Sequence, residues 1–323
     1  MLDKNMRKFK TSSFFIEYAP YMALALLLII CCISSPGFRK PQNLLNITRQ
    51  VSYSGIIALG MTYVIIGGGI DLSVGSLLAL SGTLGIMTML RIDSPMTGLL
   101  AAGAVALCVG FGGGAVNGLL VNLGKVPPFI ATLGTMSIFR SLTLQLTNAG
   151  TLSTSNGAYG NLGGALLCRI PLPTLTLFVL TALGSVLLYK TRFGRHVCAL
   201  GSNERVARYA AINTPLVSFW TYALTGLLTG LSGFLLGGRL CSISSTTAGL
   251  GYELDAIAAA IIGGTSMSGG RGSLAGTLVG VLILGIISNV LVMWGVSANL
   301  QDAVKGIVIV AAVLMQPRKA IRG

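Results

Sequence analysis

Residues 274–294, LAGTLVGVLILGIISNVLVMW, form an apolar run without a charged side chain. A helix needs about 20 such residues to cross the hydrocarbon core of a bilayer, so this run is long enough to span it. The rest of the chain of 323 residues has the same character, since 53% of its residues are hydrophobic and only 9% are charged. Long apolar runs separated by short polar segments are typical of helices that span lipid. The sequence therefore predicts an all-α integral membrane protein.

Ten segments of this kind follow one another along the chain, and the eighth is the weakest. They are 18–35, 44–67, 72–90, 97–123, 129–147, 172–190, 215–238, 253–267, 274–294 and 301–316. We therefore expect one transmembrane domain over 18–316, a bundle of about ten helices, between an N-terminal segment (1–17) and a C-terminal tail (317–323). An even number of spans places both termini on the same side of the membrane.

Lysine and arginine are concentrated near both ends of the chain and in the segment 190–214, which predicts a cytoplasmic location for all three. The basic residues concerned are Lys4, Arg7, Lys8, Lys10, Lys190, Arg192, Arg195, Arg205, Arg208, Arg318, Lys319 and Arg322. Four others would face outward, namely Arg39, Lys40, Arg91 and Arg169. We assign the net charge of +14 to orientation and to anionic membrane lipid, and expect no nucleic-acid partner.

Glycine occurs at four-residue spacing in several of the apolar runs, a pattern that lets helix backbones approach closely. The positions are Gly110, Gly114 and Gly118, Gly226 and Gly230, Gly233 and Gly237, and Gly272, Gly276 and Gly280. We expect a tight bundle in which these faces pack within the chain rather than against a second copy. The segment 148–173 is rich in Gly, Ser, Thr and Asn, and we expect an outward surface loop with one short helix.

Two interruptions divide apolar runs, VIIGGGIDLSVGS (64–76) and AIIGGTSMSGGRGS (260–273). Each joins Ile-Ile-Gly-Gly to a polar, glycine-rich turn. Broken or re-entrant helices are tolerated at membrane depth only where protein or a water-filled cavity satisfies the freed backbone, so these segments are candidates for a transport pathway. The alternative is that both are ordinary loops of a glycine-rich chain.

Polar side chains in the interruptions are, by position alone, the candidates for lining such a pathway. They are Asp71, Ser73 and Ser76 in the first and Thr265, Ser266 and Ser268 in the second. An acid in an apolar core is a functional candidate. Asp71 also precedes a helix expected from about Leu72, where its carboxylate would accept backbone N–H groups, and we favour this capping role. Glu253 and Asp255 present the same choice, with the same answer.

The segment 190–214, KTRFGRHVCALGSNERVARYAAINT, is unusually charged for this chain. After Gly201 a short helix is expected, with Ser202 or Asn203 as its N-cap, Glu204 in its first turn, and Arg205 and Arg208 on one face. Pro215 then begins the next span. A charged helix held between two spans suits contact with a cytoplasmic partner, whereas charge alone is equally typical of an ordinary cytoplasmic loop.

The motifs of a catalytic subunit do not occur in the sequence. GLLVNLGKV (118–126) approaches a phosphate-binding loop, but its spacing is wrong and Val126 stands where a Mg²⁺-binding hydroxyl is needed. His196 is the single histidine, which argues against a catalytic triad and against a His-based metal site. No channel filter or acidic ring is evident. We therefore expect a transporter that is not an enzyme and binds no cofactor or metal.

Four long segments, in order, resemble the permease subunit of ribose-type ATP-binding cassette (ABC) sugar importers. They are GIIALGMTYVIIGGGIDLSVGS (55–76), PPFIATLGTMSIFRS (127–141), TRFGRHVCALGSNERVARYAAIN (191–213) and GYELDAIAAAIIGGTSMSGGRGSLAGTLVG (251–280). The likeness extends from about Ser35 to Met315, which is nearly the whole chain.

This resemblance implies a homodimer in the bacterial inner membrane, with both termini cytoplasmic. A cytoplasmic ATPase would hold ATP and Mg²⁺, and a periplasmic sugar-binding protein would deliver the substrate. The coupling helix would dock on the ATPase, with the coupling residues Arg195, Gly201, Asn203, Glu204, Arg205 and Arg208. Ribose is the first substrate expected, while other pentoses, hexoses such as allose or galactose, and autoinducer-type sugars stay open. The competing class is an ion-coupled secondary transporter that acts alone.

The sequence departs from the pattern of this family at three positions. Ser202 stands where a second Gly usually follows Gly201, Ala211 replaces a Gly, and Ser141 follows Arg140 where Gly is common. We expect alanine at position 211 to remove access to positive φ and to reshape the end of the helix.

Overall fold

The computed structural model describes residues 2–315, with side chains from Tyr18 onward except at residues 298, 299, 309, 312, 313 and 315. The expected C-terminal tail (317–323) and the basic side chains near both ends lie outside these described residues. A single continuous helix, α1, extends over Leu2–Ser34. No helix boundary therefore separates the segment 1–17 from the first expected span.

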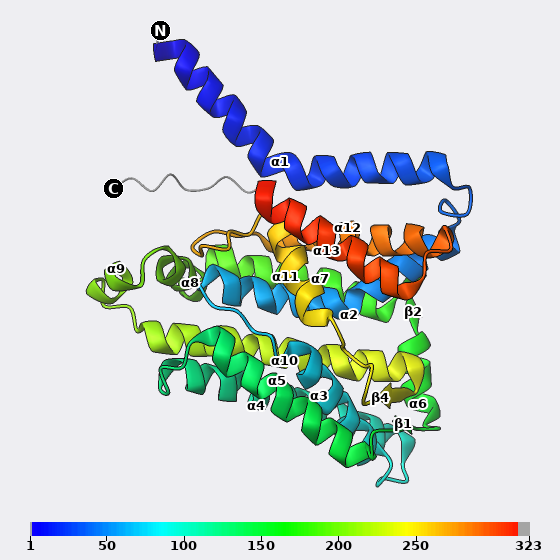
Figure 1. Cartoon of the computed structure of the whole chain (residues 1–323). Coiled ribbons are helices and arrows are strands. Elements are labelled where there is room, and N and C mark those ends of the chain that lie inside the picture. The colour runs from blue at the N-terminus through cyan, green and yellow to red at the C-terminus, as the bar shows by residue number, and fades with distance from the viewer. Residues whose placement is uncertain (1, 316–323) are drawn as a thin grey trace.

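The described chain is almost wholly helical (Figure 1). After α1 its longer helices are α2 (Pro41–Ile66), α3 (Val74–Met89), α4 (Pro95–Asn122), α5 (Pro128–Thr147), α7 (Leu172–Lys190), α10 (Thr214–Leu240), α12 (Leu274–Met293) and α13 (Ala298–Met315). Its shorter helices are α6 (Gly157–Gly164), α8 (Arg192–Ser202), α9 (Glu204–Tyr209) and α11 (Tyr252–Ile262). Five of the longer helices, α2, α4, α5, α7 and α10, have a proline in their first turn. Its fixed φ suits a helix start, and its missing N–H costs no hydrogen bond there.

Each of the ten expected segments overlaps a helix, but they differ in their capacity to cross a membrane. By length and composition, α4, α7, α10 and α12 are long and apolar enough among the described residues. The expected span 253–267 is wrong as a span, because α11 has 11 residues and a length of about 16 Å. That helix ends at Ile262, within the second interruption (260–273).

The glycine faces pack within the chain, as the spacing predicts. Helix α10 lies against α4, and a Cβ atom on Gly110 would clash with the carbonyl of Gly226 and lie 2.7 Å from the backbone nitrogen of Gly230. Gly276 and Gly280 of α12 approach Gly263 and Ala259 in the same way. Small residues thus allow backbone contact that larger side chains would prevent.

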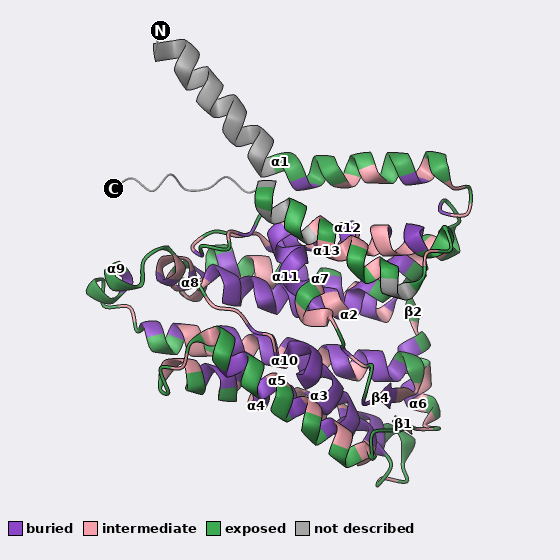
Figure 2. Cartoon of the chain, viewed as in Figure 1, coloured by how far each residue is buried: buried purple, intermediate pink, exposed green. Residues whose placement is uncertain are grey.

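The centre of the bundle is formed by α2, which is buried at every residue from Gly55 to Ile66 (Figure 2). Helices α7, α10, α11 and α12 pack around it. Figure 1 shows α8 and α9 at one end of the bundle and α6 at the opposite end.

The end of the bundle near α6 contains four short strands, in two pairs, that the sequence does not predict. Strand β1 (Thr151–Ser153) pairs antiparallel with β4 (Ser242–Ser244), and β2 (Leu166–Leu167) pairs with β3 (Ile170–Pro171). The short helix expected within 148–173 is present as α6. Strands of two or three residues have no detectable periodicity, so only the tertiary structure reveals them.

Candidate functional site

Helices α8 and α9 connect two long apolar helices at one end of the bundle (Figure 1). Helix α9 begins after Asn203, whose side-chain oxygen accepts the N–H of Val206 at 3.2 Å, so the predicted cap is present. Helix α8 was not predicted. Its buried residues Gly194, Val197 and Leu200 recur every third position, a pattern that could have revealed it.

Two further side chains of α8 bear on the chemistry of this segment. Arg195 is exposed, as expected for a residue that meets a partner. Burial raises the pKa of the Cys198 thiol, so this group stays protonated and is a poor nucleophile. Helix α8 therefore buries one face against the bundle and exposes a basic side chain elsewhere on its surface.

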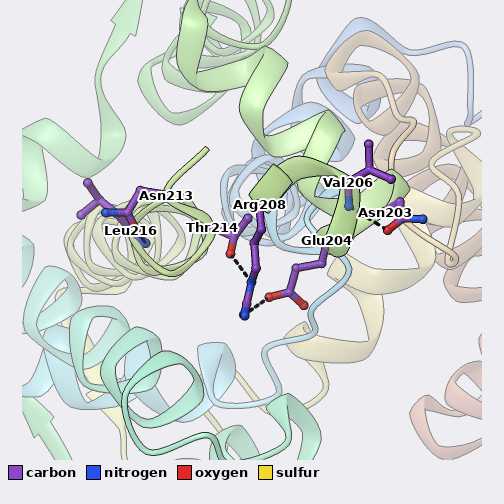
Figure 3. A network of polar contacts seen from close by, with 7 residues as sticks. All are labelled: Asn203, Glu204, Val206, Arg208, Asn213, Thr214 and Leu216. Atoms are coloured by element: carbon purple, nitrogen blue, oxygen red, sulfur yellow. Dashed lines mark hydrogen bonds and ion pairs between the residues drawn. The ribbon is translucent and has the colours of Figure 1, made fainter. Parts of the chain in front are cut away.

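Arg208 fixes α9 to the start of α10 (Figure 3). Its Nη2 lies 2.6 Å from Oε1 of Glu204, and its Nε donates to Oγ1 of Thr214 at 3.1 Å. Asn213 caps α10 by accepting the N–H of Leu216 at 3.2 Å. The exposed ion pair itself contributes only about 0.3–0.5 kcal/mol, so its main effect is to hold the side chains in place.

The outward surface of α9 combines charge with apolar area. Tyr209 is 91% exposed and Val206 is 61% exposed. Arg205, which precedes Val206 in the chain, is exposed as well. Exposed large apolar side chains rimmed by charge are typical of protein contact surfaces. This α9 surface is therefore suited to a protein partner.

Gly201, near the end of α8, lies where three backbone segments meet. The N–H of Gly270, in the second interruption, donates to the carbonyl of Ile66 at the end of α2, at 2.8 Å. A Cβ atom on Gly201 would clash with that same carbonyl and would lie 2.6 Å from the nitrogen of Gly270. Only glycine fits at this approach. We call this contact of Ile66, Gly201 and Gly270 the three-backbone junction.

The second interruption is held against α7 and α8 by additional contacts. Gly270 has φ of 76° and packs against Ser202, while the hydroxyl of Tyr189 donates to the carbonyl of Gly272 at 3.1 Å. Gly270 needs the left-handed conformation that glycine adopts without strain. The segment that precedes α12 is thus held against the end of α8.

The first interruption is fixed by a buried polar network around Asp71. One carboxylate oxygen accepts the N–H and the hydroxyl of Ser73, at 2.9 and 2.7 Å. The side-chain amide of Asn117, on α4, lies 3.3 Å from both carboxylate oxygens, and its carbonyl accepts the hydroxyl of Thr135, on α5, at 2.6 Å. Asp71 and Ser73 have no exposed surface. We call these four residues the Asp71 network.

Sequence reasoning found half of this network. Asp71 does accept a backbone N–H beside a helix start, as predicted, but α3 begins at Val74 rather than near Leu72. Asn117 and Thr135 were missed. The signal available was a polar Asn117 in the otherwise apolar, glycine-rich run of α4.

The six expected pathway residues are placed as two separate groups. Asp71, Ser73, Ser76 and Thr265 are buried inside the chain. In the second interruption Ser268 is exposed, and its hydroxyl lies 2.9 Å from that of the half-buried Ser266. The role of these six residues as pathway lining stays a prediction.

The starts of α3 and α11 meet inside the bundle. A Cβ atom on Gly75 would clash with the carbonyl of Gly249 and with the carboxylate of Glu253. Glu253 and Asp255 occupy the first turn of α11, as predicted, but Asp255 pairs with Lys305 of α13 at 3.5 Å rather than with the backbone.

Comparison with known proteins identifies the family. A family model described as branched-chain amino acid transport system / permease component matches residues 43–313. The ribose import permease protein of Bacillus subtilis (strain 168) is 45% identical over 313 residues, which cover 94% of each chain. That of Escherichia coli (strain K12) is 41% identical over 317 residues, covering 97% of each. The D-allose transport system permease protein of the same strain is 35% identical over 310 residues, covering 96% of this chain and 94% of that protein. The chain therefore belongs to this family of multi-pass membrane permeases.

Proposed function

We propose that the chain is the membrane-spanning subunit of an ABC importer that carries ribose across the bacterial inner membrane. The observation that supports this most directly is the likeness, over nearly the full length of both chains, to two ribose import permease proteins at 45% and 41% identity. In this proposal two copies form a homodimer, a periplasmic binding protein delivers ribose, and a separate cytoplasmic ATPase holds ATP and Mg²⁺. Both termini and the segment 190–214 lie in the cytoplasm.

The ATPase docks on the α9 surface in this proposal. Arg205, Val206 and Tyr209 are exposed there, and Asn203, Glu204 and Arg208 hold the helix in position. Arg195 adds a basic side chain from α8. The apolar side chains of such a surface provide contact area, and its charged side chains fix the orientation in which a partner binds.

The three-backbone junction supports a route by which movement of α8 and α9 reaches the membrane. When ATP binding draws the docked helices together, α8 displaces the end of α2 through Ile66 and the second interruption through Gly270. Both interruptions adjoin helix ends, where a few residues absorb a change of direction without loss of long-range packing. The pathway then opens alternately toward the binding protein and the cytoplasm.

Uptake of ribose into proteoliposomes tests this function. The chain is reconstituted with its ATPase, with ATP inside and the binding protein and labelled ribose outside. Uptake that requires ATP, ATPase and binding protein together supports the proposal. Uptake by this chain alone, driven by an ion gradient and abolished by an uncoupler, would show instead an ion-coupled secondary transporter. Omission of the ATPase is the control that separates the two.

A further inference from the structure

Two arginine side chains converge on Tyr53, a tyrosine of α2 that is 1% exposed. Arg239 of α10 lies over the Tyr53 ring, with its guanidinium carbon 6.0 Å from the ring centroid. Arg49 precedes Tyr53 by four residues and therefore lies on the same side of α2. The charges of both guanidinium groups act on the Tyr53 hydroxyl. We call Arg49, Tyr53 and Arg239 the two-arginine site.

The positive charge of this site is not balanced by a carboxylate. Among the described residues, neither arginine forms an ion pair. The Nε atom of Arg49 is buried and has no hydrogen-bond partner within the described chain. Asp255, whose charge reaches the nearby Tyr252, is itself paired with Lys305 at 3.5 Å. A buried charged donor without an acceptor is costly, so the site is suited to an anion that supplies oxygen atoms.

The position of Arg239 on α10 places the site at the depth of phospholipid headgroups. Helix α10 has 27 residues and is one of the helices long and apolar enough to span a bilayer. Its length of about 40 Å exceeds the roughly 30 Å of the hydrocarbon core, so its last turn reaches the headgroup layer. Figure 1 shows that end of α10 near β4, opposite α8 and α9. Arg239 and Leu240 are exposed there, so lipid can reach the site.

A polar cavity of about 110 Å³ adjoins the two-arginine site. Two residues of its wall, Gln50 and Ser54, directly follow Arg49 and Tyr53 on α2. A cavity of about 150 Å³ admits benzene, so this one can hold several non-hydrogen atoms. Its hydroxyl and amide groups both donate and accept hydrogen bonds, as do the hydroxyl groups of a small neutral headgroup. The polar lining consists of Gln50, Ser54, Tyr252, Ser288 and the paired Asp255 and Lys305.

We infer that the two-arginine site binds the phosphate of an anionic phospholipid, whose hydroxyl-bearing headgroup occupies the adjoining cavity. Guanidinium groups bind phosphate oxygens through parallel N–H···O bonds, and basic sites between membrane helices hold lipid headgroups. A free phosphate ester offers the same oxygen atoms but has no acyl chains to bury against exposed apolar side chains such as Leu240. Phosphatidylglycerol combines the phosphate, the hydroxyl groups and the chains. This inference goes beyond the proposed function and does not depend on which substrate is carried.

Lipid binding to the purified full chain tests the inference. Delipidated protein in detergent is titrated with phosphatidylglycerol, with phosphatidylcholine and with glycerol 3-phosphate, and the bound molecules are counted by native mass spectrometry. We expect phosphatidylglycerol to bind at least about tenfold more tightly than the other two. Arg49→Gln and Arg239→Gln should each weaken its binding at least about tenfold, because each removes charged donors to the phosphate.

Arg39→Gln is the matched control, because Arg39 is an exposed arginine in the connection that precedes α2. Equal weakening by Arg39→Gln, or none by either site variant, would reveal general attraction to charge and overturn the inference. Equally tight glycerol 3-phosphate would assign the site to a soluble phosphate ester instead of lipid. Normal lipid binding with loss of binding-protein capture in both site variants would assign the arginines to a protein partner. Arg239 is exposed, so Arg239→Gln keeps the test valid if Arg49→Gln fails to fold.

Discussion

Ala211, between α9 and α10, adopts a left-handed backbone with φ of 58°. The expectation that alanine would remove this conformation is wrong, because the surrounding contacts impose it. The N–H of Ala211 donates to the carbonyl of Arg208 at 3.0 Å, and that of Ile212 to Ala207 at 3.1 Å. The departure at position 211 therefore leaves the helix end intact and stores strain there.

Replacing Ala211 by glycine should relieve that strain. We expect the free energy required to unfold α9 locally to rise by about 0.5–1 kcal/mol, because the left-handed region is costly for every residue with a Cβ. Hydrogen exchange of the amides of α9 measures it. Ala210→Gly is the matched control, because Ala210 has φ of −82° and glycine there should only loosen the segment. Equal effects of the two changes would refute the role of φ.

Asn117 is the central member of the Asp71 network. Asn117→Ala removes the amide that contacts both carboxylate oxygens and leaves a buried acid short of donors. We expect a loss of about 1–3 kcal/mol of stability, the cost of an unsatisfied buried polar group. Thermal unfolding in detergent measures it. Ser137→Ala on the exposed side of α5 should change the midpoint little, and a comparable loss there would argue against the network.

At the scale of elements, α8 acts on α2 and on the second interruption through one glycine. Gly201→Ala would force its Cβ into the carbonyl of Ile66, so we expect the three-backbone junction to separate. Ribose uptake per ATP hydrolysed should fall steeply in the reconstituted complex, while ATPase binding persists. Gly112→Ala on α4 is the control, since nothing lies within 4 Å of its added Cβ. Unchanged coupling in Gly201→Ala would remove the junction from the proposed route.

The α9 surface yields a separate prediction about partner binding. The sequence led us to expect that Glu204, Arg205 and Arg208 together face the ATPase, so that reversing both arginines uncouples hydrolysis from uptake. In the structure Arg208 is engaged with Glu204 and Thr214, whereas Arg205 forms no ion pair among the described residues.

Arg205→Glu alone should therefore weaken ATPase binding, and Arg208→Glu should in addition destabilise the start of α10. Co-purification of the ATPase and hydrogen exchange of α9 distinguish the two. Exposed charges contribute at most about 1 kcal/mol each, so Tyr209→Ala, which removes a side chain that is 91% exposed, should add to the effect of Arg205→Glu. Full ATPase binding by the double variant that carries both Arg205→Glu and Tyr209→Ala would contradict the proposal that the ATPase docks on the α9 surface.

Helix positions were largely predictable, and helix ends were not. The apolar runs located every long helix because the bilayer demands length and low polarity. The starts of α3 and α11 are placed by the contact of Gly75 with Gly249 and Glu253, which lie in a distant segment of the chain. Such a contact leaves no periodic trace in the sequence.

For the whole molecule, the bundle has two ends that should face different compartments. Helices α8 and α9 lie at one end and the segment containing Cys168 lies near α6 and the start of α7, at the other (Figure 1). Cys168 is exposed. In a variant that keeps only this cysteine, a membrane-impermeant maleimide should label intact spheroplasts, whereas Arg205→Cys in a background without native cysteines should react only after lysis. The reverse pattern would invert the proposed orientation.

The class of protein, the approximate place of the helices, their tight packing and the family can all be read from the amino-acid sequence. These properties depend on composition, on repeated spacing and on four long segments, all of which are local. Glycine at four-residue spacing, for example, is enough to predict that α4 and α10 approach closely.

Only the tertiary structure decided which of those segments touch. It joined Gly201 to both interruptions and gave Asp71 its partners on α4 and α5. A hydrogen bond or a backbone contact depends on positions in space, and segments far apart in the chain carry no mark in the sequence of their future neighbours.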